Sequence, residues 1–352
     1  MQRHLLEPVG EEPVEGVVRR LGAVLATDEG LAELAVRTRR SRSQSGEVAC
    51  ALAEGRVIKV FAFRGATHYL SPEDGGAYLA LRAAGRQWEL PSWQQHYRLR
   101  PSDWPRFRKT VREALTDGPL TAHELGAAVT PTYPHLRPVF EDGADTLIKP
   151  LMWQGDMSFG PRRDGQHTFQ RLQDPRWAGI WDLDEAGPYA IRSYVRTYGP
   201  ATHAHIHYWL GNGLSAGRKR LGSWVTGLAD RLVAVDVEGE TAYVLVEDLD
   251  ELLAVRPVNA VRLLPGHDQW VMGPSTRDEH VVPPAHRTPV SRKANLVLAG
   301  GVVSGTWSAT GDELQVTWFA QQGPPPREAL EQEVLRLATL LDRPLSLTLE
   351  TE

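Results

Sequence analysis

The strings DGPLT (Asp117 to Thr121) and YGPAT (Tyr198 to Thr202) begin 81 residues apart, and each follows an apolar pattern with helical spacing. In each string the glycine can end the first helix, and the proline prevents that helix from continuing. The closing threonine is a favourable N-cap for a second helix. Thr121 and Glu124 also fit a capping box, which makes the first copy the stronger signal. The repeat therefore predicts two helix-turn-helix motifs.

The segments that follow the two strings also correspond. Two apolar segments come after the first string, Leu151 to Phe159 and Gln166 to Leu172, with the turn GPRRDG between them. After the second string come a helical pattern, Ser215 to Leu228, and two strand patterns, Arg231 to Val237 and Thr241 to Val246. Helix, tight turn, helix, helix and hairpin is the order of a winged helix-turn-helix, a fold used in DNA binding and also in protein interaction.

A third, divergent winged helix is predicted at the beginning of the chain. Helical patterns cover Val17 to Leu25 and Leu31 to Val36, and a short capped helix covers Ser45 to Gly55. A strand, turn and strand follow from Val57 to Leu70. The next stretch, RQWELPSWQQHYRLRPSDWPRF, is rich in Trp, Pro and Arg, and predicts a linker with an interdomain packing surface.

Short strand patterns dominate after Pro257, with Gly300 and Gly301 as a hairpin turn, and a helix and a strand end the chain. The predicted fold class is α+β, with three tandem winged helix-turn-helix units followed by a β-rich C-terminal element. The expected segments are a divergent winged helix with its linker (1–97), a second winged helix (98–186), a third (187–256), the β-rich element (257–323), and a C-terminal helix and strand (324–352).

Composition excludes several classes of protein. The 352 residues are 41% hydrophobic and 24% charged, which is ordinary for a folded soluble chain. No apolar run approaches the roughly 20 residues that a membrane-spanning helix needs, and the N-terminus has no run of signal-peptide length. Cys50 is the single cysteine, so an internal disulfide and a Cys-rich metal site are excluded. We expect a cytoplasmic monomer.

The net charge of −5 at pH 7 gives no overall attraction to nucleic acid, so any such binding must use local patches. Cations do gather in three places, and for any one of them alone a solvated helix face is the simpler interpretation. These clusters are Arg37, Arg39, Arg40 and Arg42; then Arg98, Arg100, Arg106, Arg108, Lys109 and Arg112; and then Arg218, Lys219 and Arg220.

Five segments together suggest a family. They are FRGATHYLSPED (63–74), SFGPRRDGQHTFQRL (158–172), YVRTYGPATHAHIHYWLG (194–211), LLPGHDQWVMG (263–273) and GGVVSGTW (300–307). In this order they resemble the winged-helix DNA-binding family that includes the AlkZ-type DNA glycosylases, over most of the chain from Val17 to Phe319. The resemblance implies a concave basic surface for duplex DNA, and a reaction that needs no metal and no organic cofactor.

The resemblance also implies a reaction and a catalytic residue. Characterised members of the family remove alkylated bases or unhook interstrand cross-links, and AlkZ-type enzymes use a Gln-x-Gln pair ahead of a helix. In the matching stretch SRSQSGEVACAL, Gln44 takes the place of the second Gln and Arg42 replaces the first. An arginine has only donors, so Arg42 cannot accept a hydrogen bond from an attacking water, although it could hold a phosphate. Glu47 is expected to be a first-turn helix acid rather than a base.

Three classes of function therefore stay open. The first is a metal-free monofunctional glycosylase with Gln44 as its catalytic residue. The second is a non-catalytic DNA-binding regulator or damage-recognition protein. A protein-interaction scaffold is a third. The predicted contacts to double-stranded DNA are Arg37, Arg39, Arg40, Arg42, Arg64, His68, Lys149, Arg162, Arg163, Arg218, Lys219 and Arg220.

Three other groups have a structural interpretation. A hydrogen-bonded core histidine is the alternative for His68. His203 and His207 have a spacing that zinc sites use, but no third ligand is apparent, so no metal site is predicted. Asp268 is expected to fix a loop.

Overall fold

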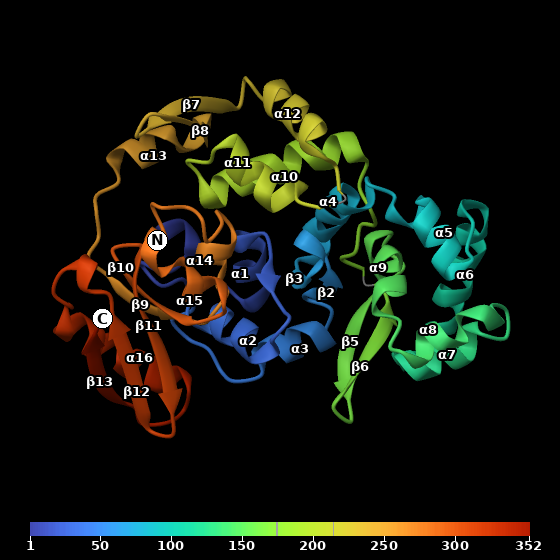
Figure 1. Cartoon of the computed structure of the whole chain (residues 1–352), viewed down its shortest axis with the longest axis horizontal. Coiled ribbons are helices and arrows are strands. Elements are labelled where there is room, and N and C mark those ends of the chain that lie inside the picture. Colours follow the sequence, from blue (N-terminus) through green and yellow to red (C-terminus); the bar gives the residue numbers. More distant parts are fainter. Residues whose placement is uncertain (174, 214) are drawn as a thin grey trace. The chain divides into compact units, whose positions relative to one another are not determined.

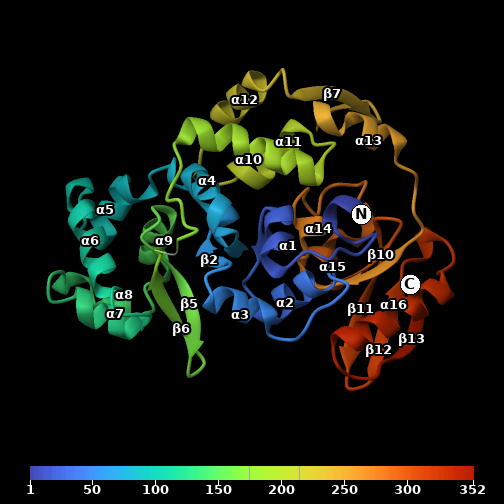
Figure 2. The same ribbon diagram turned by 180° about the vertical axis from the view of Figure 1, so that it is seen from behind.

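The structure is a computed structural model that describes residues 1–352 except Asp174, Leu214 and the side chain of Asp145 (Figures 1 and 2). The chain divides into two compact units, each built from segments that are distant in the sequence. Unit 1 comprises Met1–Val48, Tyr194–Trp209 and Asp230–Glu352, and unit 2 comprises Ala49–Ser193 and Leu210–Ala229. Helices and sheets occur in both units, which confirms the predicted α+β class.

The N-terminal part of unit 1 is helical. Its elements are α1 (Val14–Leu21), β1 (Val24–Leu25), α2 (Glu29–Arg37) and α3 (Glu47–Ala53), the last of which continues into unit 2. The helix predicted for Val17 to Leu25 ends early, because Gly22 adopts a left-handed conformation with φ 75° and its N–H caps the Arg19 carbonyl. Asp28 begins α2, since its carboxylate accepts a hydrogen bond from the Leu31 N–H at 3.1 Å.

The C-terminal part of unit 1 is a sheet in the order β13-β12-β11-β10-β9. The strands are β9 (Val261–Leu264), β10 (Asn295–Ala299), β11 (Val302–Thr310), β12 (Glu313–Trp318) and β13 (Ser346–Thr351), with α16 (Arg327–Leu340) between the last two. Gly300 and Gly301 make the predicted hairpin turn, and both have positive φ. β13 pairs in parallel with β12, so the segments 257–323 and 324–352 share one sheet.

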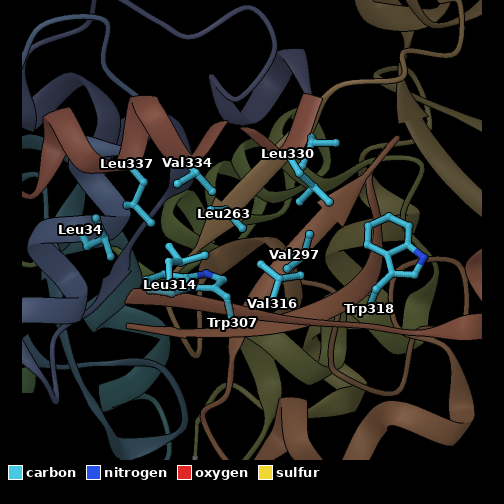
Figure 3. Close-up of a cluster of buried hydrophobic side chains, with 11 residues drawn as sticks. Leu34, Leu263, Val297, Trp307, Leu314, Val316, Trp318, Leu330, Val334 and Leu337 are labelled. Atoms are coloured by element: carbon cyan, nitrogen blue, oxygen red, sulfur yellow. The ribbon is translucent and has the colours of Figure 1, made fainter. Parts of the chain in front are cut away.

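One hydrophobic core unites this part of the chain (Figure 3). On α16, Leu330, Val334 and Leu337 face the strands that carry Leu314 and Val316. The spacing of the three leucine and valine positions puts them on one face of the helix. Leu34 of α2 belongs to the same core. The first and last segments of the chain are therefore packed together in unit 1.

The second predicted helix-turn-helix has the expected local elements. They are α10 (Leu183–Tyr198), α11 (His203–Ile206), a π-helical turn (His207–Gly211), α12 (Arg218–Gly227), β7 (Leu232–Val237) and β8 (Glu240–Leu245). Thr202 caps α11 by accepting from the His205 N–H at 3.2 Å. The shorter helices that follow in unit 1 are α13 (Leu249–Ala254), α14 (Gln269–Met272) and α15 (Arg287–Ser291).

Unit 2 contains the first copy of the repeat. Its sheet runs β3-β2-β5-β6-β4, with β2 (Ile58–Phe61), β3 (Thr67–Leu70), β4 (Leu120–Thr121), β5 (Met157–Arg163) and β6 (Gln166–Arg171). Unit 2 also contains α12, the first part of α10, and the helices α4 (Pro72–Ala83), α5 (Pro91–Tyr97), α6 (Trp104–Ala114), α7 (Ala122–Val129), α8 (Arg137–Glu141) and α9 (Asp145–Trp153). The capping box is present: Thr121 accepts from the Glu124 N–H at 3.3 Å, and Glu124 accepts from the Thr121 N–H at 2.8 Å.

Two expectations for unit 2 need correction. The segment Leu151 to Phe159 was expected to be a strand, but its first residues complete α9, and β5 begins at Met157. Gly155, with φ 75°, lies between the two elements. The stretch expected to be a linker carries α5 and the start of α6, with Trp93 and Trp104 buried.

Candidate catalytic loop and nucleic-acid contacts

Gln44 lies in the loop between α2 and α3, and its side chain is exposed. Arg42 is exposed in the same loop. Gly46 has a φ of 87°, a conformation that only glycine adopts without strain, and it turns the chain into α3. The loop therefore presents a carboxamide and a guanidinium to solvent, two residues apart.

Hydrogen bonds from α2 hold this loop on both sides of Gln44. The Arg37 Nε donates to the Ser43 Oγ at 3.3 Å. The Glu33 carboxylate accepts from the Gly46 N–H at 3.0 Å and from the Val48 N–H at 3.1 Å. The backbone around Gln44 is thus ordered by side chains of the preceding helix.

Two further side chains brace the ends of the loop. Arg40 donates from Nε to the Glu12 carbonyl at 2.9 Å, and its guanidinium also pairs with the Glu47 carboxylate. Glu47 lies in the first turn of α3, where the helix dipole stabilises a negatively charged side chain. Both observations agree with the structural role expected for Glu47.

Arg39 does not point toward solvent, so the structure removes it from the predicted DNA contacts. Its side chain is 0% exposed and makes two hydrogen bonds to the Asp268 carboxylate, at 2.8 and 2.6 Å, and one to the Ala35 carbonyl, at 2.7 Å. Asp268 also accepts from the Trp270 N–H at 2.8 Å at the start of α14, which confirms that it fixes a loop.

His68 and Arg37 also differ from their predicted role. His68 is 2% exposed, its Nδ1 lies 3.0 Å from the Ala66 carbonyl oxygen, and burial lowers its pKa to about 4. It is therefore a neutral core histidine at pH 7, with no charge to offer a phosphate. Arg37 is 6% exposed, and the bond to Ser43 directs it into the loop rather than outward.

The remaining predicted cations lie in unit 2 and are mostly exposed. Arg162 and Arg163 are the last two residues of β5, next to the turn of the β5–β6 hairpin, and Arg163 forms an ion pair with Glu124. In both ribbon views the hairpin begins near the end of α9 and extends away from that helix (Figures 1 and 2). Lys149 on α9 is half-buried, with its Nζ 4.7 Å from the centre of the Phe61 ring. The exposed members of this group are Arg64, Arg162, Arg163, Arg218, Lys219 and Arg220.

A cavity in unit 2 lies next to the β5–β6 hairpin, where Arg162 contacts two of its lining residues, Gly165 and His167. Its volume is about 590 Å³, and α7, α8 and β6 line it with side chains that include His123, Phe140 and Phe169. Its lining contains none of the predicted site residues. The candidate chemistry therefore rests on the loop that carries Gln44.

Comparison with known proteins identifies the family. The sequence matches the AlkZ-like DNA glycosylase family over residues 18–340. The chain belongs to this family. It is 34% identical over 348 residues to the interstrand DNA cross-link repair glycosylase of Streptomyces sahachiroi, across 96% of this chain and 93% of that protein. The solved structure of Streptomyces sahachiroi DNA glycosylase AlkZ superposes with a TM-score of 0.90 at 33% identity, covering 99% of this chain and 96% of the other.

Membership of the AlkZ-like family confirms the resemblance inferred from the sequence. In this member of the family, His203 is exposed and its Nε2 lies 3.0 Å from the Tyr243 hydroxyl, whereas His205 lies 3.6 Å from the Asp278 carboxylate. Across the part of the chain that the structure describes, no three His, Cys, Asp or Glu side chains gather as metal ligands. The helices described there also include none long and apolar enough to cross a bilayer.

Glu33 is the residue that sequence reasoning missed in this AlkZ-like chain. Its carboxyl is half-buried beside the loop, and burial raises its pKa, against the opposing effects of the Val48 and Gly46 N–H donors and of Arg37. The sequence feature that could have indicated Glu33 is its spacing from Arg37. The two residues are one helical turn apart and share a face of α2.

Proposed function

We propose that this chain is a monofunctional DNA glycosylase that hydrolyses the N-glycosidic bond of an alkylated base in duplex DNA, without a metal or organic cofactor. The observation that carries the proposal is that Gln44 is exposed on an ordered loop. The resemblance matches Gln44 to the second Gln of the family's Gln-x-Gln pair. The relative from Streptomyces sahachiroi is named for repair of cross-linked DNA, which favours a purine alkylated on a ring nitrogen as the substrate.

The reaction needs little from the protein, because such a base is already cationic. The C1′–N bond breaks and its electron pair neutralises the charge on the leaving base. A water molecule forms the new C1′–O bond and releases its proton to solvent. Gln44 would orient this water through its amide oxygen, which accepts a hydrogen bond and carries no charge that solvent can titrate. The products are the free alkylated base and an abasic site.

Three winged helices would supply the contacts to DNA. The element orders α6-β4-α7-α9-β5-β6 and α10-α11-α12-β7-β8 each fit this motif, and α1-α2-α3-β2-β3 fits a divergent copy. The exposed arginines at the end of β5 and in the first turn of α12 would bind phosphates, and we propose that the protein acts as a monomer. Such contacts give affinity without base specificity, so recognition of the lesion depends on the damaged nucleotide itself.

A damage-recognition protein without catalysis is the second candidate, and Arg42 favours it. The guanidinium places a fixed positive charge where the family has a Gln, and a cation opposes the positive charge that develops on the sugar. Arg42 could instead neutralise a phosphate next to the lesion.

Base release from a duplex that carries one 7-methylguanine separates the two candidates. We expect the wild-type protein to produce abasic sites, seen as strand cleavage after alkali, and Gln44→Ala to lose this activity while still binding the duplex. Gln332→Ala, which removes an exposed glutamine on α16, is the matched control and should keep full activity. Tight binding by the wild type without abasic sites would support the recognition protein instead.

A further inference from the structure

A separate cavity lies within unit 1, where the beginning of the chain meets α10, α13 and α14. Its volume is about 220 Å³, which exceeds the roughly 150 Å³ of an apolar protein cavity that holds benzene. Its walls come from residues 1–4, the end of α10, the end of α13 and the segment 270–281. None of the predicted DNA contacts belongs to these walls, so binding of DNA does not account for the cavity.

His4 supplies this cavity with a hydrogen-bond acceptor that the protein leaves unused. The side chain is 5% exposed, and among the residues that the structure describes its Nδ1 has no hydrogen-bond partner. The ring bonds to the Thr197 backbone, so its proton lies on Nε2 and faces that carbonyl. Burial, and then the positive charge of Arg39, lower the pKa of His4 well below its usual value. The imidazole is therefore neutral at pH 7, and Nδ1 keeps a lone pair that is costly to bury unless a donor reaches it.

Two aromatic rings surround His4 and give the cavity flat apolar walls. The ring centres of Tyr198 and Trp270 each lie 4.9 Å from that of His4, with interplanar angles of 81° and 77°. Their polar atoms are engaged elsewhere, since the Tyr198 hydroxyl donates to the Leu21 carbonyl and the Trp270 Nε1 donates to the Gly301 carbonyl, both at 2.8 Å. These walls therefore favour an aromatic ring.

The side of the cavity that α13 forms is aliphatic and open. Leu252 and Val255 line it, and Val281 belongs to the same lining. Val255 is 57% exposed although it borders the cavity, so a small molecule can enter from solvent on this side. Apolar walls with one converging polar group are typical of a small-molecule site.

The charged side chains at the cavity already have partners within the protein. The Arg3 guanidinium lies 3.2 Å from the Asp248 carboxylate and donates to the Arg196 carbonyl at 3.2 Å. The Asp278 carboxylate accepts from the His280 N–H at 3.0 Å and lies 3.1 Å from the His280 Nδ1. A charged ligand would lose its hydration without gaining an unpaired opposite charge, so the cavity favours an uncharged one.

We propose that this cavity binds a small, uncharged aromatic molecule that donates a hydrogen bond to the His4 Nδ1. An O–H or N–H on the ring satisfies the buried acceptor, and the ring itself packs against Tyr198 and Trp270. Phenol and indole combine these two features. The site goes beyond the proposed glycosylase function and does not depend on Gln44.

Calorimetric titration of the full chain with phenol and with anisole tests the hydrogen bond. The two molecules share a ring, but anisole carries a methyl group in place of the hydroxyl hydrogen and cannot donate. We expect phenol to bind about tenfold more tightly than anisole, because only phenol satisfies the buried acceptor. Equal affinities, or no binding of phenol at millimolar concentration, would overturn the proposal.

Two substitutions locate the site. His4→Phe removes the acceptor and keeps a ring, so the preference for phenol over anisole should disappear. His135→Phe, at an exposed histidine of unit 2, is the matched control and should keep it. A preference that survives in His4→Phe would contradict the proposed contact.

The second substitution is Val255→Trp, which fills the cavity from an exposed position and does not depend on how well His4→Phe folds. We expect it to abolish the binding of both molecules. Val246→Trp is its control, since Val246 is 49% exposed in the same part of the chain and does not line the cavity. Undiminished binding of phenol to Val255→Trp would show that the ligand binds elsewhere and would refute the proposal.

Discussion

At the scale of single residues, the loop between α2 and α3 joins two side chains with opposite consequences for the chemistry. Gln44 can accept a hydrogen bond from water, and Arg42 can only donate. Both are exposed, whereas their neighbours Arg37 and Arg39 are buried. The cluster of four arginines in the sequence is therefore divided by the fold into exposed and internal members.

If the proposed match of Arg42 and Gln44 to the family's Gln-x-Gln pair holds, Arg42→Gln gives the loop a second glutamine, and it removes one positive charge in any case. If Arg42 binds a phosphate, the slope of log affinity against log salt concentration should become shallower by about 0.9, and base release should become faster. Arg256→Gln, which removes an exposed charge elsewhere in unit 1, is the matched control. A titration of duplex binding against salt gives the slope, and an unchanged slope would rule out the phosphate contact.

The exposed position of Gln44 follows from local sequence, because polar residues and a glycine separate two helical patterns. The burial of Arg39 has no such local signal. It depends on Asp268, which is 229 residues away in the chain. Likewise, His68 lies in β3, and the local sequence does not say whether its side chain faces the core or the surface. Only the tertiary structure shows that it is buried.

At the scale of elements, the DGPLT string forms a turn that two sets of hydrogen bonds hold in place. Thr121 exchanges hydrogen bonds with Glu124, and β4 pairs with β6, which places Leu120 opposite Phe169. The turn between two helices is thereby connected to the hairpin. The capping box is a local contact, so the string predicts the start of α7, whereas the segment Leu151 to Phe159 spans the boundary between α9 and β5.

Thr121→Ala removes the N-cap of α7 and should lower the free energy of unfolding by about 1 kcal/mol. Glu124 would keep its ion pair with Arg163, so the loss should stay near that value. Urea unfolding of the two proteins measures it. Thr132→Ala, at an exposed threonine of the same unit, serves as the control, and an equal effect of both substitutions would argue against a capping role.

At the scale of the molecule, unit 1 is assembled from three separate stretches of chain. Strand patterns and the Gly300-Gly301 turn made its sheet predictable. The packing of α2 against that sheet was not predictable. In the sequence Leu34 is one apolar helix residue among many, and only the structure shows that it belongs to the same core as the sheet. The loop of Gln44 is thus supported by the opposite end of the sequence.

Leu337→Ala tests this dependence. The side chain is fully buried in the core that also holds Leu34, so its truncation should cost about 2–5 kcal/mol of unfolding free energy. Leu335, on the same helix, is 67% exposed, and Leu335→Ala should stay within about 0.5 kcal/mol of the wild type. Urea denaturation compares the three proteins, and a small loss in Leu337→Ala would contradict a shared core.

The salt bridge between Arg39 and Asp268 bears on how the protein is made. During translation, the segment that carries Gln44 leaves the ribosome long before its partner does, whereas most of unit 2 emerges as one continuous stretch that can fold as it appears. The candidate catalytic loop therefore completes its packing only after the segment that contains Asp268 has been synthesised, and a product that ends before this segment would contain the glutamine without the scaffold that orders it.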